Sequence, residues 1–318
     1  RDYYASRGLG DVYKRQRKYM MNLFANSSSN WVKYDKYEWK KADNGTLYIT
    51  PTEDAKPSLY NPVKEYQDMV LAAINIGTLA MKEEPKESLQ ASIIDFACNY
   101  GLLGLMTALP TTPEFITYEA VYLPKNHFIR EESLSTEKYL SYFFPFDNID
   151  FVKHGVESSW STDSSEMIAL IMAMKNKPQA VLMSFQKEYA ERYDWLVTVF
   201  RDWAFTFFSS FLYYQDYDRL DENERNLYRQ GMAVFGGIAP TYHIELLDKP
   251  TIVWEFHSLL LGIQMMFSFM LTDDNSTLKV CKHCGSAFVA TRSNMEFCSP
   301  QCKNQYNVYK SRAKKKED

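Results

Sequence analysis

Four of the five cysteines in this 318-residue chain lie near its C-terminal end, in two pairs. Cys281 and Cys284 form the first pair, and Cys298 and Cys302 form the second after thirteen intervening residues. Two thiol pairs, each spanning one tight turn and separated by a spacer of hairpin length, are typical of a tetrahedral zinc site. We therefore expect one structural Zn²⁺ held by these four thiolates.

The residues around the cysteines favour a compact metal-binding module. Gly285 permits a sharp turn directly after the first pair. Ser299 and Pro300 have the residue types of a helix N-cap and first helical position, which places Cys302 in the first turn of a helix. Between the pairs we expect a hairpin with strands at 287–290 and 295–297.

Two disulfides are the alternative use of the same four cysteines. They need an oxidising compartment, and we recognise no secretory signal in the sequence. We therefore expect reduced cysteines and a cytoplasmic protein. His283 lies between two expected ligands and is a possible substitute, but a set of four cysteines already completes a tetrahedral site.

The charge of the chain is unevenly distributed. The net charge is −4, yet residues 275–318 contain nine Lys and Arg against three acidic residues, so this end carries +6 and the remainder −10. Basic residues mixed with tyrosine and asparagine beside a metal site favour nucleic acid as a partner, with DNA and RNA both open at this point. The expected contact residues are Arg292, Lys303, Tyr306, Lys310, Arg312, Lys314, Lys315 and Lys316. A solubilising basic terminus without a partner is the alternative.

This C-terminal region resembles the CGNR-type zinc-finger proteins of bacteria. The resemblance rests on the four cysteines, the run 287–289, Arg292, the Phe297-Cys298-Ser299 triplet and a basic helix after Cys302. It covers about 40 residues and departs from the family motif at Lys303-Asn304-Gln305, where Gly-Asn-Arg is typical. The resemblance implies a helical N-terminal domain, a C-terminal zinc finger and DNA-binding transcription regulation.

The rest of the chain predicts a mainly α-helical body. We expect a non-native or disordered leader at 1–18, a mostly helical domain at 19–275, and the zinc-binding module with its basic helix at 276–318. The module is expected to be zinc-ribbon or treble-clef-like. The hydrophobic fraction of 46%, with 23 Tyr and 20 Phe, is sufficient for a large packed core.

Local signals locate the elements of this body. Asn44-Gly45 between two β-prone runs predicts an N-terminal hairpin, and Asn61-Pro62 predicts the start of a helix. Capping-box patterns at 163–166 and 221–224 predict two more helix starts. Apolar periodicity predicts helices at 88–109, from 178 to 207 and at 252–271, and a short strand at 242–247.

Three classes of function remain open from the sequence. The first is nucleic-acid binding by the basic zinc tail. The second is a protein interaction module in which the zinc is purely structural. The zinc hairpin and the 252–271 helix then dock a partner, either another protein or a second copy in a homo-oligomer. The third is an enzyme with its site in the helical body, which we expect least because no phosphate-binding loop, nucleophile elbow or His-Glu-x-x-His motif is present. We do not expect membrane association, because the 252–271 run contains Glu255, His257 and Gln264.

Overall fold

The fold was analysed in a computed structural model. It describes residues 31–105, 190–216, 219–234, 240–246, 248–256, 258–272, 278–290, 292 and 294–317, with short pieces at 120–122, 128, 133–135 and 146. The expected leader at 1–18 and the capping box at 163–166 lie outside these ranges.

The described part of the chain is a helical core edged by small antiparallel sheets. It contains six α-helices, which take up 51% of it, and five sheets of two or three strands. The prediction of a mainly α-helical body therefore holds only in part, because strands recur along the chain. The helices are α2 (Tyr66–Met81), α3 (Lys86–Tyr100), α8 (Tyr193–Asp216), α9 (Glu222–Val234), α10 (Leu259–Thr272) and α11 (Pro300–Glu317).

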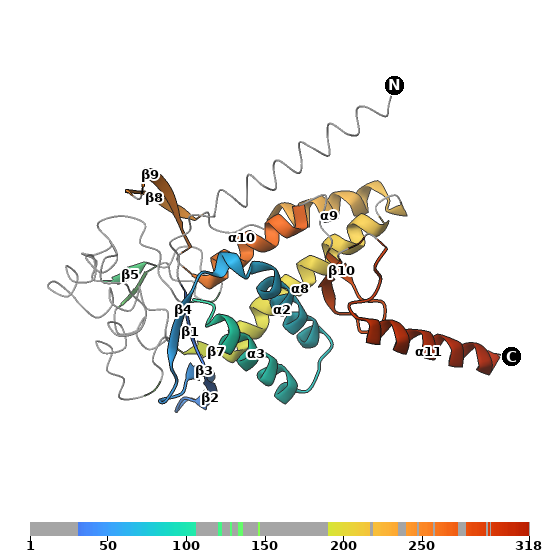
Figure 1. The fold of residues 1–318 in the computed structure, drawn as a ribbon, viewed down its shortest axis with the longest axis horizontal. Helices are drawn as coiled ribbons and strands as arrows, with labels where there is room; N and C mark the ends of the chain where they lie inside the picture. The colour runs from blue at the N-terminus through green and yellow to red at the C-terminus, as the bar shows by residue number, and fades with distance from the viewer. Residues whose placement is uncertain are drawn as a thin grey trace, which may run out of the picture.

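Helix α2 is the centre of the core and packs along α8, against α3 and against α10 (Figure 1). Gly77 allows the close crossing of α2 and α8, because a Cβ at this position would lie 1.9 Å from the carbonyl oxygen of Phe200. The apolar positions whose periodicity predicts a helix up to residue 207 are buried in α8, with Phe200 and Phe207 at most 2% exposed. The core is thus built from helix faces that the apolar periodicity predicts.

The predicted N-terminal hairpin is confirmed. Strands β2 (Tyr37–Lys41) and β3 (Leu47–Pro51) are antiparallel, and Gly45 in the turn has a φ of +79°. Strands β1 (Trp31–Tyr34) and β4 (Pro57–Tyr60) form a second antiparallel pair. Two short pieces, β5 (Ala120–Tyr122) and β6 (Ser133–Ser135), pair with each other.

Two helix starts agree with the local signals. Asn61 caps a short 3₁₀ turn, η1 (Pro62–Lys64), immediately before α2. At α9 the capping box is complete: the Glu224 amide donates to Asp221 Oδ1 (2.9 Å) and the Asp221 amide to Glu224 Oε2 (3.0 Å).

Two predicted helix boundaries are wrong. The helix expected over 88–109 ends at Tyr100, because Gly101 adopts a φ of +86° and lies against Val32, where a Cβ would be 2.3 Å from the backbone oxygen. The helix expected from 178 to 207 is present as α8, which begins at Tyr193. It cannot begin earlier in the described chain because β7 (Glu191–Arg192) precedes it and pairs with β3. The first twelve residues of that expected helix lie outside the described ranges.

The apolar run expected as one helix over 252–271 is divided in two. Its first part is β9 (Pro250–Glu255), which pairs with β8 (Thr241–Leu246), and only the second part is helix α10. The β-branched sequence Thr251-Ile252-Val253 favours the strand, and Ser258 Oγ accepts the Leu261 amide at the start of the helix. The predicted strand at 242–247 is confirmed as β8. Among the described residues, no helix is both long enough and apolar enough to cross a bilayer.

Candidate metal centre

The four C-terminal cysteines converge on one point. The Sγ atoms of Cys281, Cys284, Cys298 and Cys302 all lie within 4.8 Å of one another. All five cysteines of the chain are free thiols. The Sγ atoms of Cys284 and Cys298 are 3.7 Å apart, and those of Cys298 and Cys302 are 3.5 Å apart.

These separations fit a metal ion better than disulfides. A disulfide needs sulfur atoms at about 2.0 Å, whereas tetrahedral Zn²⁺ with Zn–S bonds of about 2.3 Å places its sulfur ligands about 3.8 Å apart. The cluster can therefore hold one tetrahedral ion with little movement. Cys98, the fifth cysteine, lies on α3 and is not part of it.

A tight turn and a two-stranded ribbon position the first cysteine pair. Strand β10 (Leu278–Val280) runs into Cys281, and β11 (Ala287–Val289) returns alongside it. Between them the Gly285 amide donates to the Cys281 oxygen and the Cys281 amide to the Ser286 oxygen, both at 2.9 Å. Gly285 has a φ of +74°, which an L side chain rarely adopts.

The predicted hairpin between the two cysteine pairs is partly wrong. The first strand is present as β11, but its partner is β10, which precedes the first cysteine pair. Residues 295–297 do not form a strand. Met295 donates its amide to the Arg292 oxygen as in a turn, and a backbone bond from the Lys282 amide to the Glu296 oxygen (3.0 Å) attaches the segment to the first pair.

The second cysteine pair lies at the start of α11, as predicted. Ser299 Oγ accepts the Cys302 amide (3.2 Å), and Pro300 is the first helical residue. Cys302 is thus fixed in the first turn, where the positive end of the helix dipole favours a thiolate. A metal ion at the cluster would hold the start of α11 against the β10–β11 ribbon.

The thiols do not ionise equally in the absence of a cation. Burial opposes ionisation of Cys281, but backbone amides of residues 284, 298 and 283 outweigh it and lower its pKa to about 6. Burial, together with hydrogen bonds to Cys302 and Cys281, raises the pKa of Cys298 to about 12. A cation is therefore needed to bring Cys298 to the thiolate form at neutral pH.

Two side chains that the sequence did not predict hold this module against the helical core, one in α2 and one at its C-terminus. Lys82 Nζ donates to the Cys284 oxygen (3.1 Å), which brings a positive charge close to the thiolates. Asn75 bonds to Ala287 from the middle of α2. No sequence signal could have identified them, because they lie about two hundred positions away from the cysteines.

The Lys282 ammonium group, next to the first cysteine, pairs with the Glu296 carboxylate. This ion pair lowers the pKa of the Glu296 carboxyl. His283 stacks its ring on Tyr309 (5.7 Å between centroids, 17° between planes) and is not one of the clustered residues.

The candidate nucleic-acid contacts are spread along α11 and the segment before it. Lys303, Lys310 and Arg312 are exposed on α11, and Arg292 is exposed between β11 and the helix. Lys314, Lys315 and Lys316 lie in the last turns of α11.

Tyr306 is half-buried with its ring 5.2 Å from that of Phe297, so it packs on the cysteine module. Figure 1 shows α11 running away from the rest of the described chain toward the C-terminus.

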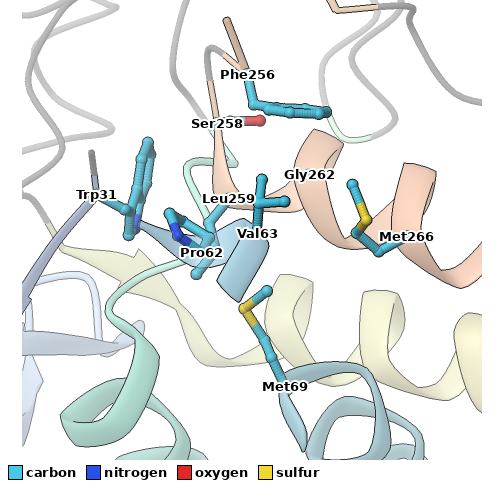
Figure 2. Close-up of a pocket in the computed structure, with 9 residues that line it drawn as sticks. All are labelled: Trp31, Pro62, Val63, Met69, Phe256, Ser258, Leu259, Gly262 and Met266. Carbon is cyan, nitrogen blue, oxygen red and sulfur yellow. The ribbon is translucent and has the colours of Figure 1, made fainter. Parts of the chain in front are cut away.

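A small apolar cavity lies in the helical core, between η1, α2 and α10. Figure 2 shows Trp31, Val63, Met69, Leu259 and Met266 around it. It has room for about one water molecule, ≈ 10 Å³, and no titratable side chain lines it. This cavity therefore gives no support to the enzyme hypothesis.

Comparison with known proteins adds no relative: no family model matches the chain, and no match was found among curated proteins or among solved structures. The CGNR-type resemblance therefore stays a prediction based on the residues alone.

Proposed function

We propose that this protein binds one structural Zn²⁺ through Cys281, Cys284, Cys298 and Cys302 and uses the basic helix α11 to bind nucleic acid, most naturally as a DNA-binding regulator. The observation that carries the proposal is the position of Cys302. It belongs to the cysteine cluster and also to the first turn of the basic helix. A metal ion bound by Cys302 would therefore also fix the direction in which α11 leaves the cysteine module.

The composition of α11 supports a polyanionic partner. The helix contains six Lys and Arg against one acidic residue, Glu317. Lys303 and Lys310 are two turns apart on one exposed stripe, while Tyr306 faces the cysteine module. A helix this polar on all sides gains little from burial and is expected to be stabilised by neutralising its charge.

Five of the seven proposed cationic contacts are lysines, with Arg292 and Arg312 as the exceptions. Lysine neutralises a phosphate but lacks the planar fork with which arginine reads guanine. We therefore expect binding that depends strongly on salt and only weakly on sequence. If Lys303, Lys310 and Arg312 each contact one phosphate, a plot of the logarithm of the binding constant against the logarithm of the salt concentration has a slope of about −3.

The structure gives less support to docking of a protein partner by the zinc hairpin and by α10, the helical part of the 252–271 segment. Ala287 of β11 is already buried in the main hydrophobic core, and so are Phe267 and Ile263 of α10. These surfaces are occupied within the chain itself.

The test is fluorescence anisotropy of the zinc-loaded protein on a mixed-sequence DNA duplex across a salt series, before and after chelation. We expect binding that weakens steeply with salt and is lost with the metal. The Lys310→Gln/Arg312→Gln double variant should reduce the salt slope by about 2. Lys41→Gln/Lys56→Gln removes the same charge from exposed positions of the N-terminal strand region and should leave the slope unchanged. Absence of binding at low salt, or an equal effect of both double variants, would refute the proposal.

A further inference from the structure

The β8–β9 hairpin has one face made entirely of apolar side chains. Its register pairs Tyr242 with Trp254, Ile244 with Ile252 and Leu246 with Pro250. Because side chains alternate along a strand, these six residues point to the same side. We call this surface the ribbon face, and it contains no charged residue.

The ribbon face is largely open to solvent. Leu246 is 80% exposed, Ile244 68%, Tyr242 63% and Ile252 50%. On the opposite side of β9, Val253 is buried, with 3% of its surface exposed. Figure 1 shows the hairpin extending from the helical core at the end away from α11. Of the six residues, Trp254 is partly buried and packs against that core.

Such a hairpin gains little stability from its own contacts. A two-stranded ribbon is marginal in water unless its apolar face packs on something. Given the usual size of such side chains, the four most exposed residues present on the order of 500 Å² of apolar surface, about the largest patch found on a typical monomer. Burying this surface would stabilise both the hairpin and its attachment to the core.

We propose that the ribbon face is a dimer interface and that its occupant is the ribbon face of a second copy of this chain. Two such faces together bury about 1,000 Å², the lower limit for a specific protein interface. A two-fold arrangement places the Ile244–Ile252 pairs of both copies at its centre, and the aliphatic end of each hairpin over the aromatic Tyr242–Trp254 pair of the other. No charge is buried in this contact, so two copies can meet without a desolvation penalty.

The proposal requires neither the metal nor nucleic acid. It is therefore tested on the full-length protein by sedimentation velocity at concentrations from about 1 to about 100 µM, a range that brackets the affinity of an interface this small. We expect the weight-average mass to rise with concentration from that of one chain toward that of two, with and without a chelator.

Ile244→Lys places a charge at the centre of the interface and should abolish the rise. Glu245→Lys is the matched control, because it adds lysine at the neighbouring exposed position on the opposite face of β8. It should leave the dimer intact.

Far-ultraviolet circular dichroism verifies folding, and Leu246→Lys replaces Ile244→Lys if that variant does not fold. A protein that stays monomeric at about 100 µM, or a dimer that persists in the folded lysine variant of the ribbon face, would overturn the proposal.

Discussion

Asn75, in the middle of α2, bonds to both backbone groups of Ala287 in β11. Its Oδ1 accepts the Ala287 amide at 2.9 Å, and its Nδ2 donates to the Ala287 oxygen at 3.3 Å. The side chain thus takes the place of a neighbouring strand at the free edge of the β10–β11 ribbon. It joins the cysteine module to the helical core.

Removing this side chain should destabilise the protein. Ala287 is 4% exposed, so Asn75→Ala leaves a buried amide and carbonyl without these partners. We expect the free energy of unfolding to fall by about 1–3 kcal/mol. Urea denaturation followed by tryptophan fluorescence measures this change. Asn99→Ala, at an exposed position of α3, should cost less than about 0.5 kcal/mol; similar losses in both variants would contradict the role of Asn75.

Glu191 holds the loop that follows α3, residues 101–105, by hydrogen bonds to its backbone. Its carboxylate is 2% exposed and accepts the backbone amides of Leu103 (2.9 Å), Gly104 (2.7 Å) and Leu105 (2.9 Å). Glu191→Gln replaces one acceptor oxygen with an NH₂ group that faces amide donors, so we expect a loss of about 2–4 kcal/mol. The same denaturation experiment on Glu53→Gln, at an exposed turn, serves as control. A Glu191→Gln protein as stable as the parent would show that the loop is held by other contacts.

The metal should depend on the four clustered cysteines and not on His283. The His283 ring stacks on Tyr309, so His283→Ala should retain one metal ion per chain. Cys302→Ser should lose the ion, because three thiolates bind Zn²⁺ more weakly than four. Elemental analysis after dialysis gives the stoichiometry, and Cys98→Ser is the control that should keep the metal. Loss of metal in His283→Ala would place the imidazole among the ligands.

Metal affinity should fall as pH is lowered. The pKa of Cys298 is raised to about 12, so this thiol must release its proton when the ion binds. The pKa of Cys281 is lowered to about 6, so this thiol is ionised at neutral pH and adds a further proton to the exchange only below that value. We expect at least about a tenfold loss of affinity per pH unit between pH 8 and pH 7, and a steeper loss below pH 6. Competition with a chelator across this range measures the dependence, and an affinity that does not change with pH would exclude thiol ligands.

Several predictions from residues close together in the chain are confirmed. The paired cysteines, the Asp221–Glu224 capping box, the Asn44-Gly45 turn and the Ser299 cap all lie within one short segment each. Their geometry follows from local backbone preferences. The buried stripe of α8 also followed from periodicity, because its residues recur on one face of a single helix.

The sequence by itself determined which four residues can bind a metal and where several helices and one hairpin begin. Only the tertiary structure decided that 250–255 is a strand beside β8, that α3 ends where Gly101 meets Val32, and that Asn75 and Glu191 hold distant segments. The physical reason is distance along the chain: these two side chains bond to partners 212 and 87 positions away. Such contacts depend on how whole elements pack, and no local pattern of residues encodes them.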